Sequence, residues 1–286
     1  MQQVDTSHLN GAGGAAATVT VSGVVPGCEL AGESLRQPRV SVVIPALNEA
    51  RNLPHVFATL PSDIYEIVLV DGGSTDRTVE VARDLYPAVR IVGQMGRGKG
   101  DALASGFAAA RGDIIVMLDA DGSARGEEIP LFVDALRNGA DFAKGSRFIA
   151  GGGSSDITFV RRLGNAFLSG LVNLLYGTRY SDLCYGYNAF WSRCLEHINV
   201  DCDGFEVETL INIRVARAGL VVAEVPSFED DRIYGESNLR TFRDGFRVLR
   251  TIFRELPRRA TTDMDAFATT DMDADAVAVA VPAVPG

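Results

Sequence analysis

Two aspartates, Asp119 and Asp121, follow an apolar run and are separated only by Ala120. The run, residues 114–118, predicts a strand buried on both faces, as in a parallel sheet covered by helices. Such sheets bind ligands at the carboxyl ends of their strands. Two acids there repel each other, so the pair predicts a Mg2+ or Mn2+ site that holds a substrate diphosphate. The alternative is a simple turn, because Asp121 and Gly122 are both common turn formers.

The elements that must position this pair alternate between strand and helix. Apolar and β-branched runs predict strands at 39–44, 66–70, 89–92, 114–118 and 141–145. Helices are expected at about 48–60, 76–85 and 101–111. This alternation at short spacing is typical of a parallel sheet with right-handed crossovers. The sequence therefore predicts an α/β fold with a single Rossmann-like, mostly parallel sheet flanked by helices.

The composition suggests one folded domain between two tails. The chain has 286 residues and is 47% hydrophobic, which is enough for a full core. Residues 1–36 lack periodicity, and the last 26 residues, 261–286, are acidic and contain no Lys or Arg. We expect disordered tails at 1–36 and 259–286 and a folded domain at 37–258. The formal charge of −10 argues against nucleic-acid binding.

Cysteine usage and hydropathy bear on location. The four cysteines form no C-x-x-C pair, a pattern that fits reduced thiols in a cytoplasmic protein. No Lys or Arg precedes Arg36 and no apolar segment follows in the manner of a signal peptide. No apolar run approaches the roughly 20 residues that cross a bilayer. We expect a cytoplasmic protein.

A glycine-rich loop, residues 93–100, matches most of the phosphate-binding pattern G-x-x-x-x-G-K-[ST]. Gly100 stands where the pattern needs a hydroxyl for Mg2+, and the loop follows the third strand, so we reject a P-loop ATPase. Two interpretations stay open. The backbone amides and Lys99 neutralise a diphosphate, or the loop is a flexible turn that needs its glycines.

Four segments, VSVVIPALNEARNL, IVLVDGGSTDRT, GRGKGDAL and IIVMLDADG, together resemble the family 2 glycosyltransferases of the GT-A fold. The later segments GSRF, DLCYG, EVP and RIYGESNL resemble those of the dolichyl- or polyprenyl-phosphate sugar transferases and their bacterial relatives. The resemblance covers about residues 39–255. It implies a metal-dependent, inverting hexosyltransferase that moves a sugar from a UDP- or GDP-hexose to a polyprenyl phosphate.

The resemblance assigns the donor site residue by residue. Pro45, Asn48 and Glu49 fall where the family lines the nucleobase and ribose, and Asp71 falls in its second nucleotide-contact motif. The family usually has two acids there, whereas this chain has Gly72 in the second place. The choice between UDP and GDP therefore stays open.

The same resemblance assigns the diphosphate and its metal. Asp119 and Asp121 match the family's metal and diphosphate pair, with Ala120 between them, and Lys99 is expected near the diphosphate. Ser123 stands where some polyprenyl-phosphate mannose synthases use Gln as a further metal contact. The expected metal ligands are thus Asp119, Asp121 and Ser123, for Mg2+ or Mn2+.

On the acceptor side, Arg147 and Arg232, and either Arg161 or Arg162, match family arginines around an acceptor phosphate. Arginine suits this task because its planar fork donates two hydrogen bonds to a phosphate. For any single arginine the alternative is a surface salt bridge.

A catalytic base is the remaining question. Asp203, Glu206 and Glu208 occupy the region where members with hydroxyl acceptors carry a base, although the glutamates could instead stabilise a helix N-terminus. A phosphate acceptor is already anionic and needs no base, whereas an alcohol does. The candidate catalytic residues are Asp121, Arg147, Arg232 and Glu208.

An amphipathic C-terminal helix is expected within residues 238–256. Its apolar stripe is formed by Leu239, Phe242, Phe246, Leu249, Phe253 and Leu256. A parallel basic stripe is formed by Arg240, Arg243, Arg247, Arg250 and Arg254. Such a helix could lie on the anionic inner face of the cell membrane. The alternative is a helix packed on the core with a solvated basic face.

Other functions are weighed against this one. A soluble phosphorylated or hydroxyl acceptor is a second possibility for the same enzyme. A nucleotidyltransferase is disfavoured because the chain lacks an N-terminal glycine-rich signature followed by Arg and Lys. A catalytically inactive, membrane-associated binding module is disfavoured by the intact Asp-Ala-Asp and RIYGESNL segments.

Overall fold

The computed structural model of the chain describes residues 37–235 and 240–256. The elements below belong to one compact unit that begins at Pro38. Both predicted tails, 1–36 and 259–286, lie outside the described residues.

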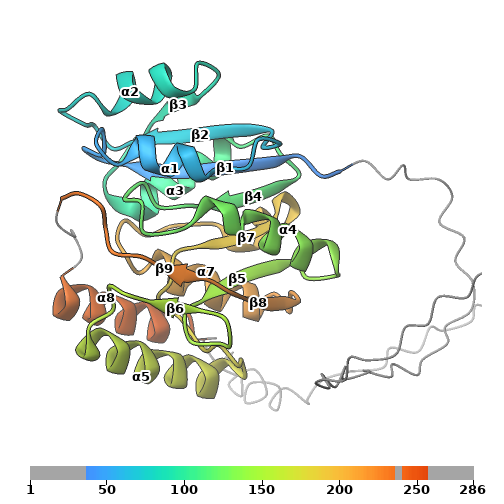
Figure 1. Cartoon of the computed structure of the whole chain (residues 1–286). Helices are drawn as coiled ribbons and strands as arrows, with labels where there is room; N and C mark the ends of the chain where they lie inside the picture. Colours follow the sequence, from blue (N-terminus) through green and yellow to red (C-terminus); the bar gives the residue numbers. More distant parts are fainter. Residues whose placement is uncertain (1–36, 236–239, 257–286) are drawn as a thin grey trace, which may run out of the picture. The chain divides into compact units, whose positions relative to one another are not determined.

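Seven strands form one sheet in the order β3-β2-β1-β4-β7-β5-β8 (Figure 1). Their bounds are β1 Val40–Ala46, β2 Glu66–Asp71, β3 Arg90–Gly93, β4 Ile114–Met117, β5 Phe142–Ser146, β7 Asn188–Trp191 and β8 Val222–Pro226. All neighbours are parallel except β7, which runs antiparallel to β4 and β5. A separate two-stranded sheet pairs β6 (Gly153–Ser154) with β9 (Phe228–Glu229). The predicted mostly parallel sheet is confirmed.

Strand β1 continues past its predicted end at residue 44. Pro45 and Ala46 still pair with Val70 and Asp71 of β2. On the other side, β4 pairs only as far as Val43. Proline is tolerated at this point because its missing N–H faces the side where β4 has already ended.

The helices are α1 Leu53–Thr59, α2 Thr78–Leu85, α3 Gly98–Ala109, α4 Ile129–Arg137, α5 Phe159–Tyr176, α6 Leu195–Ile198, α7 Val207–Arg217 and α8 Thr241–Arg254. Two short 3-10 turns, Gly126–Glu128 and Ser192–Cys194, precede α4 and α6. Helix α1 begins later than expected, at Leu53. Helix α3 begins earlier, inside the glycine-rich loop.

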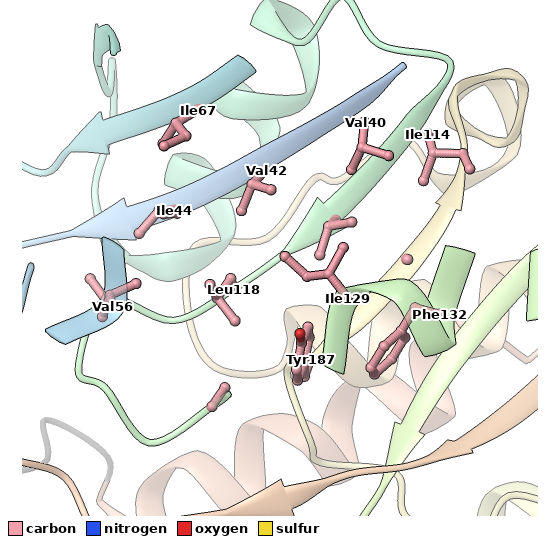
Figure 2. Packing of buried hydrophobic residues seen from close by; sticks show 14 of the residues in the cluster. Val40, Val42, Ile44, Val56, Ile67, Ile114, Leu118, Ile129, Phe132 and Tyr187 are labelled. Atoms are coloured by element: carbon pink, nitrogen blue, oxygen red, sulfur yellow. The ribbon is translucent and has the colours of Figure 1, made fainter. Parts of the chain in front are cut away.

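The sheet separates two apolar clusters, one on each face. Ile114 and Val116 of β4 belong to the first cluster, which Phe132 of α4 also joins (Figure 2). Ile115 and Met117 belong to the second, which includes residues of α3 and α7. The prediction that this run is a strand buried on both faces is therefore confirmed.

Helices α5 and α8 lie side by side away from the main sheet (Figure 1). Val172 of α5 and both Val248 and Ile252 of α8 form a third cluster with residues that include Ile213 of α7. None of the described helices combines the length and the apolar character needed to cross a membrane.

Candidate active site

The turn that carries the two aspartates begins directly after β4. The N–H of Leu118 still donates to Val43 of β1, at 3.1 Å. Beyond it, Asp121 Oδ1 accepts hydrogen bonds from the N–H of Ser123 at 3.0 Å and from its hydroxyl at 2.7 Å. Gly122 has a φ of 79°, which glycine adopts without strain. The turn interpretation is thus correct locally, and it leaves Asp121 Oδ2 for another partner.

Lys99 connects Asp119 to Glu208. Its ammonium lies 2.7 Å from Asp119 Oδ1, 2.9 Å from Asp119 Oδ2 and 2.8 Å from Glu208 Oε1. Lys99 belongs to the first turn of α3, and Glu208 to the first turn of α7. Burial lowers the pKa of Lys99, but the two carboxylates more than offset this and raise it above its ordinary value. Lys99 is therefore a cation held against Asp119.

The glycines around Lys99 are explained by packing. A Cβ on Gly98 would lie 2.0 Å from the carbonyl oxygen of Asp203, and one on Gly100 would lie 2.0 Å from that of Cys202. The N–H of Gly100 donates to Asp203 at 3.0 Å. Glycine is thus needed so that α3 can begin against the segment before α7 and deliver Lys99 to Asp119.

Arg232 plays the corresponding role at Asp121. Its Nη2 lies 3.1 Å from Asp121 Oδ2, and its Nη1 lies 2.9 Å from Glu49 Oε1. Glu49 is buried, and burial raises its pKa, with only partial compensation from hydrogen bonds donated by Asn52 and Arg232. The second aspartate therefore shares an arginine with a carboxylate that precedes α1.

Charge and donor chemistry fit a divalent cation here. Four carboxylates, on Glu49, Asp119, Asp121 and Glu208, face two cations, so the carboxylates outnumber the cations by two. The described residues contain no cluster of three or more His, Cys, Asp or Glu arranged as a complete metal site. Mg2+ commonly needs only one or two carboxylates when substrate phosphates and water supply the other ligands. Asp119, Asp121 and the Ser123 hydroxyl offer suitable oxygen atoms.

The residues expected on the nucleoside lie at the carboxyl ends of β1 and β2. Asn48, which has a φ of 57°, accepts the N–H of Thr75 at 2.8 Å, and its own N–H donates to the hydroxyl of Ser74 at 2.9 Å. Asp71 Oδ1 accepts the N–H of Ser74 at 3.1 Å. Asn48 therefore joins the loop after β1 to the loop after β2, whereas Asp71 stabilises the loop that follows its own strand.

Gly72, which departs from the usual two acids, leaves room for a neighbour. A Cβ at this position would lie 3.0 Å from Gln94 Oε1, which comes from the loop after β3. The absence of a side chain at Gly72 thus brings an amide to the loops where a nucleoside is expected.

Arg147 has partners that the sequence did not predict. Its Nε and Nη2 donate to the two oxygens of Asp182 at 2.7 and 3.0 Å, and its Nη1 donates to Glu229 at 2.9 Å. The side chain is only 4% exposed. The arginine assigned by resemblance to an acceptor phosphate is here a buried connection between three segments of the chain.

The two candidate arginines on α5 differ in their surroundings. Arg161 pairs with Asp156 at 2.7 Å, as in the salt-bridge alternative. The guanidinium of Arg162 lies 5.5 Å from the ring centre of Phe148, and that of Arg147 lies at the same distance from this ring. Arg162 is therefore the one of the two that shares a neighbour with Arg147.

The sequence interpretation missed Asn52 and Tyr234. Asn52 is buried between Glu49 and the backbone of Tyr234, next to the Arg232 ion pairs. In the sequence, Asn52 precedes Leu-Pro at a helix start and reads as an ordinary N-cap. Only the fold shows that its amide faces a segment from the other end of the domain.

The family model of glycosyl transferase family 2 matches residues 41–198, which is more than half of the chain. The chain is a family 2 glycosyltransferase. It is 35% identical over 225 residues to the dolichol-phosphate mannosyltransferase of Pyrococcus furiosus, a match that covers 76% of this chain and 63% of the relative. It is 32% identical to the glycosyltransferase AglJ of Haloferax volcanii, and this match covers 80% of this chain and 74% of the relative. The chain thus spans less than two thirds of the length of the first relative.

Solved structures show the same fold for this glycosyltransferase. Glucosyl-3-phosphoglycerate synthase from Mycobacterium tuberculosis matches with a TM-score of 0.59 and 25% identity, over 77% of this chain and 81% of that one. A structure of that enzyme with Mn2+, uridine diphosphate and phosphoglyceric acid matches with a TM-score of 0.60 and 22% identity, over 78% and 80%. The predicted GT-A architecture is therefore confirmed.

Proposed function

We propose that this family 2 glycosyltransferase transfers a hexose, with inversion, from a UDP- or GDP-sugar to a polyprenyl phosphate. The observation that carries the proposal is the cluster at the mouth of β4, where Lys99 and Arg232 hold Asp119 and Asp121. The 35% identity to a dolichol-phosphate mannosyltransferase supports the lipid-phosphate acceptor.

Asp119 and Asp121 would hold Mg2+ or Mn2+, with the Ser123 hydroxyl and phosphate oxygens nearby. When bound, the metal would stabilise the negative charge of the departing nucleoside diphosphate. Lys99 adds a fixed positive charge beside Asp119, and preorganised charges of this kind stabilise charge that develops during reaction. Pro45, Asn48, Glu49 and Asp71 would border the nucleoside at the ends of β1 and β2.

The position of Glu208 supports an anionic acceptor. Its side chain is 4% exposed and is paired with Lys99 rather than directed to solvent. A carboxylate engaged in this way is poorly placed to take a proton from an incoming hydroxyl. A polyprenyl phosphate brings its own charged nucleophile and needs no such base. Arg232, partly exposed beside Asp121, is the arginine best placed to meet an acceptor phosphate.

The surface of α8 supports contact with a membrane that carries the acceptor. Phe242 is 87% exposed and Phe246 is 69% exposed, while Val248 and Ile252 on the opposite face are buried. Exposed arginines, among them Arg243, follow the phenylalanines along the helix. An apolar stripe beside basic residues is typical of helices that lie on anionic bilayers. Neighbouring α5 also exposes Phe159, Leu163, Phe167 and Leu174.

The test is transfer of radiolabelled sugar to two acceptors. A thermal-shift screen of UDP, GDP and TDP with Mn2+ first identifies the nucleotide. Sugar transfer is then measured with a short-chain polyprenyl phosphate and with 3-phosphoglycerate, a soluble phosphorylated acceptor. The proposal predicts metal-dependent transfer to the lipid phosphate. Transfer to the soluble acceptor alone would replace it with the soluble-acceptor alternative, and absence of nucleotide-sugar turnover would favour an inactive binding module.

A further inference from the structure

Residues 229–235, called here the crossing segment, run from β9 over the turn that carries Asp121. The N–H of Asp230 donates to the carbonyl of Ser123 at 2.8 Å, and the N–H of Ile233 donates to the carbonyl of Asp121 at 3.3 Å. The Ile233 side chain fills the space above Gly122, where a Cβ would lie 2.6 Å from it. The crossing segment is therefore fixed to the backbone of the aspartate turn.

The far end of the crossing segment is held by Asn52. The N–H of Tyr234 donates to Asn52 Oδ1 at 3.0 Å, and Asn52 Nδ2 donates to the carbonyl of Tyr234 at 3.1 Å. The same Nδ2 contacts Glu49 Oε2. A primary amide offers an acceptor and a donor side by side, so it pairs with one peptide as a neighbouring strand would. Aspartate could not do this when ionised, because it has no donor.

Helix capping does not account for Asn52. The residue occupies the N-cap position of α1, where asparagine is among the favoured residues, yet its side chain makes no capping hydrogen bond. The amide is buried and all its recorded hydrogen bonds go to Tyr234 and Glu49. The position is thus occupied by a good capping residue whose side chain serves another contact.

These contacts form a closed circuit around one arginine. Glu49, which Asn52 holds through Oε2, pairs through Oε1 with Arg232. The peptide that Asn52 holds belongs to Tyr234, two residues after Arg232. We propose that Asn52 is a positioning residue for sugar transfer. It sets the guanidinium of Arg232 beside Asp121 by fixing Glu49, the carboxylate partner of Arg232, and by fixing the backbone at Tyr234, two residues after Arg232. This inference rests on the function proposed above.

The structure provides a matched control. The ring of His55 lies 5.8 Å from that of Tyr234, centre to centre, so it touches the same residue from the same helix. Within the described part of the chain, no hydrogen bond, ion pair or ring contact joins the His55 side chain to Glu49 or Arg232. His55→Ala therefore loosens the Tyr234 side chain without breaking the circuit.

The decisive experiment is a double-mutant cycle on the full chain, with the rate constant for transfer to the short-chain polyprenyl phosphate as the measured quantity. Asn52→Ala is expected to reduce kcat by at least about tenfold, since small displacements of a positioned group have effects of this size. In an Arg232→Ala background the same change should have an effect below about twofold, because residues that act through one another are not additive. His55→Ala should leave kcat within about twofold in both backgrounds.

A second variant and a second readout protect the test against misfolding. Asn52→Ser retains a residue favoured at the N-cap, but its side chain is too short to pair with the Tyr234 peptide. Both Asn52 variants should speed hydrogen exchange at the Tyr234 amide, whereas His55→Ala should not. Equal loss of kcat in both backgrounds, or unchanged exchange at Tyr234, would overturn the role of Asn52. Wild-type transfer by Arg232→Ala alone would instead refute the part of the proposed function that assigns Arg232.

Discussion

Asp119 and Asp121 form ion pairs with different basic side chains, although only Ala120 lies between them. Lys99 contacts both oxygens of Asp119, and Arg232 contacts one oxygen of Asp121. The aspartates could be predicted from the sequence because an acidic pair directly after a buried strand is a local pattern. Their partners could be assigned only by resemblance, because these contacts join a helix start and a late loop to the strand end.

Glu208 provides a prediction that separates a base from a structural partner. Glu208→Gln should lower the free energy of unfolding by about 1–3 kcal/mol, because buried Lys99 then keeps only one charged partner. Transfer to a polyprenyl phosphate should fall by less than about tenfold, whereas loss of a general base costs about 100- to 10,000-fold. Urea unfolding and transfer rates measure the two effects. Glu196→Gln, at an exposed position of α6, is the control for stability. A loss of activity above 100-fold without loss of stability would show that Glu208 is the base.

Arg147 is predicted to act mainly on stability. Arg147→Met should lower the free energy of unfolding by about 3–5 kcal/mol, because it leaves the buried Asp182 carboxylate without its two guanidinium donors. The matched control is Arg193→Met, which breaks an exposed pair with Asp141 and should cost less than about 1 kcal/mol. Urea denaturation compares the variants. Unchanged stability in Arg147→Met, together with weaker acceptor binding, would restore the phosphate-binding role that the sequence suggested.

At the scale of elements, periodicity and strand signals located the first five strands of the sheet, although not β8, which also runs parallel to its neighbour. Strands β1, β2, β3, β4 and β5 fall within two residues of the predicted ranges. Strand β7 was missed, because four residues between two irregular segments give little periodic signal, and its place between β4 and β5 depends on a long-range antiparallel pairing. Helix α3 was expected to begin at residue 101, since its glycines disfavour a helix locally, whereas packing against Cys202 and Asp203 overrides that preference.

The amphipathic C-terminal helix was predicted, but its phenylalanines turn outward. Phe242 and Phe246 were grouped with the apolar stripe, whereas the residues of α8 that pack on the domain include Val248 and Ile252. The sequence could not decide between core packing and an exposed apolar face, because both give the same helical period.

Helix α8 therefore supports a prediction about membranes. The double variant Phe242→Ser/Phe246→Ser should reduce binding to anionic liposomes, because it removes the exposed apolar area that lies beside the arginines. Replacing Arg240, Arg243 and Arg247 by Gln should weaken binding by roughly 1 kcal/mol per charge. Cosedimentation at low salt measures both. Leu131→Ser, on the exposed side of α4, is the control and should have no effect. Equal binding by all variants, or none by the unmodified protein, would exclude α8 as the contact.

At the scale of the whole molecule, the proposed metal ligands Asp119, Asp121 and Ser123 and their partners Lys99 and Arg232 all lie within the described residues. The predicted boundaries of the tails stay predictions, since the tails lie outside the described residues. Removal of residues 262–286 should change neither the melting temperature nor the transfer rate, because this Ala-, Val- and Asp-rich sequence has no periodic face with which to dock. Differential scanning fluorimetry and the transfer assay test this. A large drop in melting temperature would show that the segment packs on the domain.

The most direct test of the account is metal-dependent nucleotide binding by variants of the aspartate pair. The unmodified protein should be stabilised by the preferred nucleoside diphosphate with Mn2+, by about 2.7 kcal/mol at a ligand concentration 100 times the dissociation constant. Asp119→Asn and Asp121→Asn should remain folded and lose this stabilisation, because each removes a metal ligand without a change in side-chain volume. Asp134→Asn, an exposed aspartate on α4, should retain it. Retention of the Mn2+-dependent stabilisation by either active-site variant, or sugar transfer by either at the wild-type rate without metal, would contradict the account.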